Sequence, residues 1–436
     1  MPPSNWFKRL FGVQRPEPPS ALEPGLTHVM QESEDGTITR LHLRVEHDGS
    51  GMLIANAAAA AHLTPTGTLI VQGILDGDNE ATILQRLKEN FQGATEATMR
   101  ADIERIQVLI EQILEPGDTY PVFNLDSGPF APESVELIAP LQATVPLAEP
   151  ERLVPLLDRL WNVGIPHATF LMSEALQSAD LIRAVERAED LGMIAGIRGR
   201  PADLTPHLSE LIMVGVDHVT VPYASHDAAT HDALLGSDDH AAATDLFAWL
   251  ETNGICAVAE VPLVETTLET LEPTVISLLE LGADNIIFVA YATADPALTE
   301  DGVFFTDAMP QVANRVEEVA HTTQARFIWA PPVVRIPEML LSAQIRLGPR
   351  CVGDVTVRVE PDGSVIPPRG RYRTAGNILE DDWSAIWHHE AFRAYRERVE
   401  APSRCDICPD LLICVAGCPS DPRTWAANVA ANGGVE

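Results

Sequence analysis

The feature that most limits the possible folds is an alternation of short apolar runs with amphipathic segments between about Ser134 and Thr293. This order is typical of parallel βα units. A glycine precedes each apolar run after the first, and glycine is common at the C-terminal ends of helices. Six units predict an α/β fold, a closed or partial (βα)6 barrel. The predicted strands are Val135–Ala139, Ala168–Met172, Met193–Ile197, His218–Val221, Ala257–Leu263 and Ile286–Ala290.

Smaller units flank this region. A proline- and glutamate-rich stretch, Pro16 to Pro24, is typical of a flexible lead. Alternating strand patterns at Ile38–Leu43 and Gly51–Asn56 then precede three helical patterns, the first capped by Thr64. The expected divisions are 1–36 for the lead, 37–115 for a small winged-helix-like α+β domain, 133–335 for the barrel and 345–425 for a cysteine-rich domain.

Charge and hydropathy exclude two classes of partner. The formal net charge of −34 makes the surface repel phosphate backbones, so we expect no nucleic-acid partner. No run of about 20 apolar residues suits a membrane helix, and no signal peptide is evident. The basic and aromatic stretch Asn5–Phe11 is too short for a firm interfacial anchor. We therefore expect a cytoplasmic protein without membrane contact.

Four of the six cysteines, Cys405, Cys408, Cys414 and Cys418, form a C-x2-C-x5-C-x3-C cluster, whereas Cys256 and Cys351 stand apart. Four thiolates at such spacing suit one iron-sulfur cluster or one tetrahedral zinc ion. In a cytosolic protein this pattern indicates metal ligation, not a disulfide framework. Arg404 would help to keep the thiols ionised.

Other ionisable residues are weaker candidates. Glu174, His226, Asp227 and Glu260 follow or lie in predicted strands, where a barrel would place a reaction site, but polar residues are normal at strand ends. Three histidines in polar helical contexts are expected to be exposed to solvent, and Cys256 is expected to be a buried apolar residue. The three histidines are His231, His388 and His389.

The segment from Cys351 to Cys418 resembles the SPASM domain, the cysteine-rich tail of many radical S-adenosylmethionine (SAM) enzymes. The cysteine spacing matches, as does a hairpin pattern with Asp-Gly at its turn, Val359–Val365. Gly376–Leu379 and the aromatic positions Trp387 and Phe392 match as well.

The βα region resembles a radical SAM core, through Gly215–Asp217 and Thr230–Asp232 among others. Members of that family hold their SAM-cleaving cluster with a C-x3-C-x2-C loop after the first strand. Here Pro140–Leu147 follows the predicted strand without any cysteine. Where the family has Gly-Gly-Glu-Pro after the second strand, this chain has Met172–Ala175. After the fourth strand, Pro222 and Ala224 stand in place of the family's serine and aspartate. The resemblance therefore implies a degenerate core that does not use SAM.

The tail also has fewer cysteines than the seven, with two clusters, of a full SPASM domain. Pro368 occupies one cysteine position, and no cysteine follows Cys418. The resemblance implies one [4Fe-4S] cluster on Cys405, Cys408, Cys414 and Cys418, with zinc as the alternative metal. Two ligand questions stay open: whether Asp421 replaces Cys418, and whether Cys351 contributes.

The N-terminal unit resembles the PqqD-like domain, or RiPP recognition element, at Leu53–Asn56, Leu63–Gly67 and Ile74–Gly77. Such domains bind a leader peptide as an added strand. Together the resemblances imply a partner or scaffold in the maturation of a ribosomal (RiPP or PQQ-like) peptide, binding a precursor peptide and perhaps acting beside an active radical SAM enzyme. Two alternatives remain: an enzyme whose C-terminal cluster transfers electrons, and a zinc-stabilised peptide-binding protein.

Overall fold

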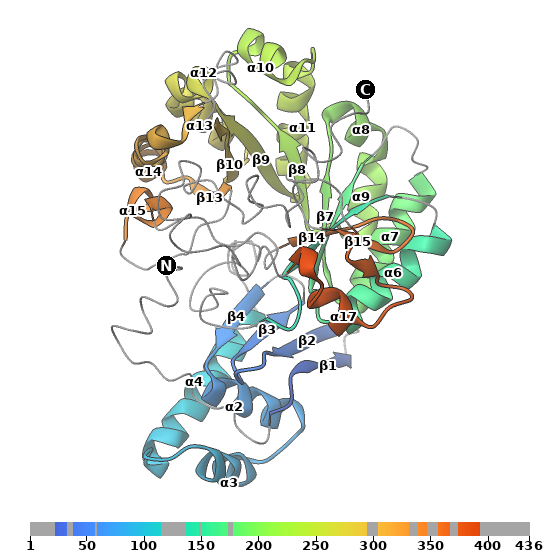
Figure 1. The fold of residues 1–436 in the computed structure, drawn as a ribbon, viewed down its shortest axis with the longest axis vertical. Helices are drawn as coiled ribbons and strands as arrows, with labels where there is room; N and C mark the ends of the chain where they lie inside the picture. The colour runs from blue at the N-terminus through green and yellow to red at the C-terminus, as the bar shows by residue number, and fades with distance from the viewer. Residues whose placement is uncertain are drawn as a thin grey trace.

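The computed structural model describes residues 22–32, 38–56, 59–114, 137–147, 150–172, 178–293, 304–330, 339–346, 356–366 and 374–392. An N-terminal unit, blue in Figure 1, lies at one end of a larger α/β region. Across these ranges, no helix is long and apolar enough to cross a bilayer.

The N-terminal unit is an antiparallel sheet with helices on one face. Its strands follow chain order: β1 (Gly25–Glu32), β2 (Ile38–Val45), β3 (Gly51–Ala55) and β4 (Ala59–Leu63). The helices are α2 (Pro65–Leu75), α3 (Glu80–Asn90) and α4 (Glu96–Leu114). The two predicted strands and three predicted helices are confirmed. The sequence patterns predict neither β4 nor β1, and β1 places the start of the unit inside the segment expected to be a flexible lead.

Local sequence explains where these helices begin. The Thr64 hydroxyl accepts a hydrogen bond from the Gly67 N–H at 3.3 Å, and Pro65 occupies the first turn of α2. Asn79 caps α3 in the same way through Thr82. The helices then cover an apolar core formed with the sheet, which includes Leu43, Leu53, Leu63, Leu69, Leu87 and Ile103.

The larger region is built on one ten-stranded sheet. Its order is β13-β10-β9-β8-β7-β6-β5-β14-β15-β16. Seven strands from β5 to β13 pair in parallel, and the outermost strands β13 and β16 do not pair with each other, so the sheet is open. The bounds are β5 Gln142–Pro146, β6 His167–Leu171, β7 Ile194–Arg198, β8 His218–Pro222, β9 Cys256–Leu263, β10 Asn285–Ala290, β13 Arg326–Ala330, β14 Thr356–Val359, β15 Ser364–Ile366 and β16 Gly376–Asn377.

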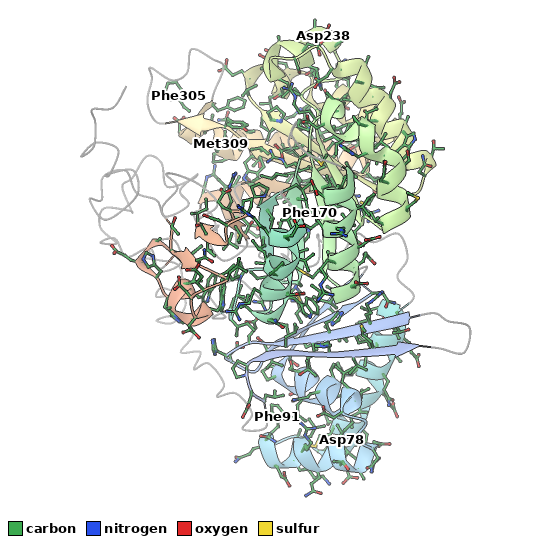
Figure 2. All side chains as sticks on the ribbon, turned by 90° about the vertical axis from the view of Figure 1, so that its right-hand side faces the viewer. Asp78, Phe91, Phe170, Asp238, Phe305 and Met309 are labelled. Carbon is green, nitrogen blue, oxygen red and sulfur yellow. The ribbon has the colours of Figure 1, made fainter. Side chains whose placement is uncertain are left out.

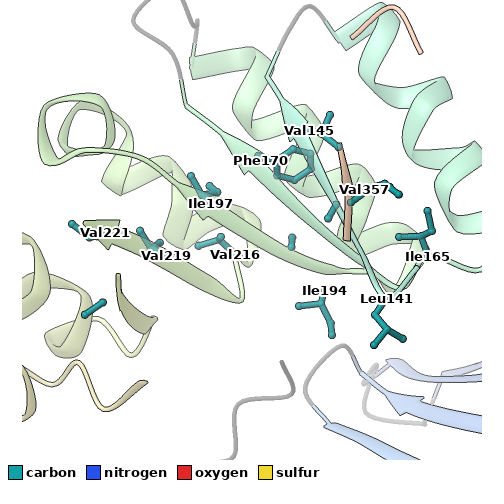
Figure 3. Close-up of a cluster of buried hydrophobic side chains, with 14 of the residues drawn as sticks. Leu141, Val145, Ile165, Phe170, Ile194, Ile197, Val216, Val219, Val221 and Val357 are labelled. Carbon is teal, nitrogen blue, oxygen red and sulfur yellow. The ribbon is translucent and has the colours of Figure 1, made fainter. Parts of the chain in front are cut away.

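Helices cover one face of this sheet and bury its apolar side chains. Figure 3 shows Val145, Phe170, Ile197, Val219 and Val221 on neighbouring strands within that buried layer. The principal covering helices are α6 (Pro150–Asn162), α7 (Ser178–Leu191), α9 (Leu208–Val214), α11 (His240–Thr252), α13 (Leu271–Glu280) and α14 (Met309–Thr323). Shorter elements are α8 (Pro201–Leu204), α10 (Ala228–Leu235), α12 (Glu265–Glu269), α15 (Leu341–Arg346), α17 (Trp383–Trp387), β11 (Ala292–Thr293) and β12 (Phe304–Phe305).

The predicted first strand is wrong where the structure describes it, because residues 137–139 form no strand; residues 135 and 136 lie outside the described ranges. The structure places that strand, β5, at Gln142–Pro146, after the apolar run Val135–Ala139. Within β5 buried Ala143 and Val145 alternate with half-buried polar residues, so the pattern is that of a sheet with one polar face. The other five predicted strands are confirmed, and β13 adds a seventh βα unit.

The N-terminal sheet lies between its own helices and the larger region, as Figure 2 shows. Arg44 of β2 is fully buried there and pairs with Glu46 at 2.6 Å. Its guanidinium also donates to the carbonyls of Pro140 and Gly164, at 3.1 and 2.9 Å. The second Glu46 oxygen accepts the Ile138 N–H at 2.7 Å. A fully desolvated ion pair with all these partners fixes the unit in place.

Helix α17 of the C-terminal region reaches the same short segment. The indole N–H of Trp383 donates to the Ile138 carbonyl and that of Trp387 to the Leu137 carbonyl, both at 2.8 Å. The two indoles stack with centroids 5.7 Å apart. We call residues 137–140 the junction segment, because both the N-terminal unit and the C-terminal region are bonded to it.

Candidate functional site

The sheet face opposite the helices, here called the inner face, carries several polar side chains. Strand register brings Thr144 of β5 beside Thr169 of β6, and Thr169 beside Gly196 of β7. Further along, Arg198 lies beside Thr220 of β8. Register partners in a parallel sheet point to the same side. The helix-facing side is apolar throughout, so these polar side chains mark the inner face as the candidate site.

Two buried histidines form the floor of the inner face. The Nε2 atoms of His167 and His218 lie 2.9 Å apart, and Gln142 donates to the Thr169 hydroxyl, which lies 3.2 Å from His167. Burial lowers the pKa of His167 to about 3, and burial and then His167 lower the pKa of His218 well below its usual value. Both rings are therefore neutral near pH 7, with one N–H donated between them.

The strand-end candidates separate into different roles. Glu260 lies on the inner face and pairs with Arg198 at 2.7 Å across β8. Asp227 instead caps α10 by accepting hydrogen bonds from the Thr230 hydroxyl at 2.7 Å and the Thr230 N–H at 2.8 Å. These two bonds lower the pKa of its carboxyl. His226 is exposed beside α13. Glu174 lies outside the described residues, so only Glu260 of the predicted set is placed on the inner face.

His231 is buried, although its sequence context predicts exposure. Its ligand atoms and those of Asp232 and Asp239 lie within 4.8 Å of one another. Each is already bonded: His231 accepts the Ala224 N–H and contacts Asp239, both at 3.3 Å. Asp232 accepts the N–H of His240 at 3.1 Å, at the start of α11. The cluster therefore joins β8, α10 and α11. His388 is exposed as expected, whereas His389 is half-buried.

The connection that would carry a SAM-cleaving cluster is short. Between β5 and α6 lie only residues 147–149, which read Leu-Ala-Glu, and the chain has no cysteine before Cys256. Met172 packs against Gly199, where an added Cβ would be 3.0 Å from Met172 Cβ. The residues present do not fit a cysteine-held cluster at this position.

The N-terminal sheet offers a second candidate surface at its edges. Met52, Ile54 and Ala60 pack into the core of the larger region, while the opposite face packs on α2 to α4. With both faces covered, only an edge strand can accept another chain. At the β4 edge the neighbouring α4 carries Leu109, which is half-buried.

The cysteine cluster lies outside the described residues, as do Cys351 and Asp421. Cys256 is half-buried, and its sulfur accepts a hydrogen bond from the Asn285 amide at 3.3 Å. Burial raises the pKa of the Cys256 thiol to about 12. This thiol therefore stays protonated at neutral pH, although its burial is only partial where full burial was expected.

A family model described as "SPASM: Iron-sulfur cluster-binding domain" matches residues 351–409. The hairpin expected in that stretch is present, because β14 and β15 pair antiparallel and Gly363 at their turn has φ +89°. The matched range includes Cys351, Cys405 and Cys408. The tail is thus similar in sequence to an iron-sulfur cluster-binding domain.

Most of the chain resembles solved structures of Streptococcus suis SuiB. The SAM-bound SuiB structure has a TM-score of 0.59 at 13% identity, covering 91% of this chain and 98% of that one. SuiB bound to its precursor peptide SuiA gives 0.57 at 13% identity, covering 91% and 99%. The two chains share a fold. This likeness supports the expected α/β architecture with its large parallel sheet.

Proposed function

We propose that this protein is a non-catalytic member of a peptide-maturation system. It binds a precursor peptide at its N-terminal unit and an iron-sulfur cluster in its tail, and it does not cleave SAM. The observation that carries the proposal is the β5–α6 connection, three residues without a cysteine, in a chain that otherwise keeps the fold of SuiB. Cofactor-borne radical chemistry requires the cofactor's ligands, which are missing here.

The peptide is proposed to add to the β4 edge beside α4. Backbone hydrogen bonds along an exposed edge supply affinity, and side-chain pockets supply specificity. Half-buried Leu109 offers apolar surface on α4 beside this edge. SuiB has been solved with its precursor peptide bound, which makes a peptide the natural class of ligand to test.

The catalytic half of the proposal is tested by SAM cleavage. Anaerobically reconstituted protein mixed with SAM and dithionite should release no 5′-deoxyadenosine, while a radical SAM enzyme of known turnover, run in parallel, reports whether the assay works. Multiple turnovers of 5′-deoxyadenosine by this protein would overturn the proposal. Iron and sulfide analysis of the same sample separates an iron-sulfur tail from a zinc one.

The peptide half is tested with random peptides displayed on phage and selected on the full chain. Leu109→Asp should reduce capture of the selected peptides, because it puts a charge beside the β4 edge. Val108→Asp is the matched control, since Val108 is the next residue on α4 and is 50% exposed. Equal binding by both variants would remove the assignment of the β4 edge.

A further inference from the structure

One buried histidine in the contact between the N-terminal unit and the larger region has no hydrogen bond. His42 of β2 is fully buried and lies in the sheet between His28 on β1 and Ile54 on β3. Among the described residues, neither of its ring nitrogens has a hydrogen-bond partner, and neither is in contact with solvent. Buried polar atoms are normally hydrogen-bonded, so an unbonded imidazole at this position lowers stability.

Two helices of the larger region enclose the His42 ring. Trp161, near the end of α6, meets it edge-on with ring centroids 4.5 Å apart. Gly192, which follows α7, lies so close that an added Cβ would clash with His42 Nε2. The contact therefore fits the neutral ring closely, and a proton can reach His42 only when the N-terminal sheet moves away from α6 and α7.

Basic groups lie next to His42 within its own sheet. His28 is at the exposed rim, with its ring centroid 6.0 Å from that of His42. On β2 itself, Arg40 and Arg44 lie two residues away on either side, and Arg44 is already paired with Glu46. The neighbours from β3 and α6 described above carry no charge. An imidazolium at position 42 would therefore be repelled by its own sheet.

The acidic groups on the side of α7 are Glu189 and Asp190. Asp190 is exposed and lies 3.9 Å from Arg187. Glu189 is half-buried, and burial raises the pKa of its carboxyl. A raised carboxyl pKa favours the docked state as pH falls, which is opposite to the effect of a proton on His42. The contribution of His42 must therefore be measured as a difference between the natural protein and a His42 variant.

The pH dependence of docking follows from these surroundings. Burial, followed by the charges of His28 and Arg40, lowers the pKa of His42 from its ordinary 6.5 to about 4. In a released sheet the ring would return to the ordinary value. The released state therefore binds more protons between these two pH values, so docking is strongest above pH 6.5 and weakens as pH falls through that window. From pH 7.5 to 5.5 the docking constant should fall about tenfold.

We propose that the contact of the N-terminal unit with α6 and α7 is an acid-sensitive joint, which opens when His42 takes up a proton. Opening separates two bodies that each keep a core, because the N-terminal helices and the helix-facing side of their sheet form a hydrophobic cluster of their own. The joint goes beyond the function proposed above, since it operates whether or not a peptide or an iron-sulfur cluster is bound.

Hydrogen exchange of the full-length protein, resolved to single amides by mass spectrometry, tests the joint. The Ile138 N–H donates to Glu46 across the contact, so its protection reports docking. The Tyr223 N–H, bonded to the Glu260 carbonyl at 2.9 Å within the larger region, reports global unfolding. After correction for the intrinsic pH dependence of exchange, protection at Ile138 should fall about tenfold from pH 7.5 to 5.5 and stay below that at Tyr223. Equal protection of the two amides at both pH values would overturn the proposal.

Substitutions at position 42 show whether this histidine is the proton-binding group. His42→Gln keeps a polar side chain, and His42→Leu replaces it with an apolar one. Neither takes up a proton in this pH range, so both should lose the fall in protection at Ile138. His47→Gln is the matched control, because His47 follows β2 and is exposed, and it should keep the fall. A fall as large as that of the natural protein in both His42 variants, or its loss in His47→Gln, would exclude His42 as the proton-binding group.

Discussion

Gly196 shows how closely the inner face is packed at its floor. His167 and His218 come from the strands on either side of β7 and meet across Gly196, where an added Cβ would lie only 2.0 Å from His218 Nε2. The site tolerates buried polar groups because they bond to one another. A larger residue at position 196 would separate the two rings.

Gly196→Ala should therefore destabilise the protein by about 1–3 kcal/mol, the usual cost of overpacking a core. Urea unfolding measures it. His218→Ala removes the obstructing ring, so the alanine at 196 should cost less in that background. Strictly additive losses in the double variant would contradict this packing.

Stability should fall in mild acid because of the same histidines. Folded His167 has a pKa near 3, below its ordinary 6.5, so the unfolded chain binds more protons between those values. The stability present above pH 6.5 is lost as pH falls through that window, by about 2 kcal/mol between pH 7 and 5. Urea midpoints across this range should drop less steeply for His167→Gln. The comparison with His167→Gln is needed because burial raises the pKa of Asp217, and a raised carboxyl pKa makes the folded state more stable as pH falls.

Cluster ligands can be separated by single substitutions. Cys405→Ser should lower bound iron and the visible iron-sulfur absorption of anaerobically reconstituted protein, and Cys418→Ser should do the same if four tail thiolates hold one cluster. Cys351→Ser should leave both unchanged. If Cys351→Ser lost iron and Cys418→Ser did not, the fourth ligand would be Cys351 and not Cys418.

The sequence predicts single residues only partly. Glu260 is placed where its strand position indicated. His231 has the polar helical context of an exposed histidine but is buried, since its burial depends on how α10 packs back on β8. The register that pairs His167 with His218 is set by three strands far apart in sequence, and no local pattern carries that information.

At the scale of elements, the Arg44–Glu46 pair links β2 to the larger region. Arg44→Ala should cost about 3–5 kcal/mol in unfolding free energy, because Glu46 would stay buried without its partner. Arg100→Ala, an ion-paired but exposed arginine of α4, should show no clear loss. Similar effects of the two variants would mean that the buried contact contributes little.

Helices and strands were predicted best where apolar residues recur regularly along the sequence. Helices α2 to α4 and strands β6 to β10 follow strong apolar periodicity. Strand β5 has alternating polar residues and ends in Pro146, so a search for apolar runs selects Val135–Ala139 instead. Strand β1 pairs with β2 over eight residues despite its polar sequence, GLTHVMQE. Its pairing is set by tertiary contact.

At the scale of the whole molecule, the N-terminal unit and the larger region share one core. Met52, Ile54 and Ala60 belong to the hydrophobic cluster of the larger region. The full chain should therefore melt in one calorimetric transition. Deleting residues 1–114 should lower the melting temperature of what remains, because it exposes that apolar surface. Two independent transitions in the full chain would contradict a shared core.

The junction segment is held by hydrogen bonds through its peptide groups as well as by the buried side chains of Leu137 and Ala139. The carbonyls of residues 137 and 138 accept hydrogen bonds from the indole N–H groups of α17. The Ile138 N–H donates to Glu46, and the Pro140 carbonyl accepts a hydrogen bond from Arg44. Every residue except proline offers these same groups, so substitutions here are tolerated as far as side-chain packing allows. Inserting or deleting one residue is different. It would shift the peptide donors and acceptors of the segment relative to their partners on both β2 and α17. In related sequences the length of this segment should vary less than its composition.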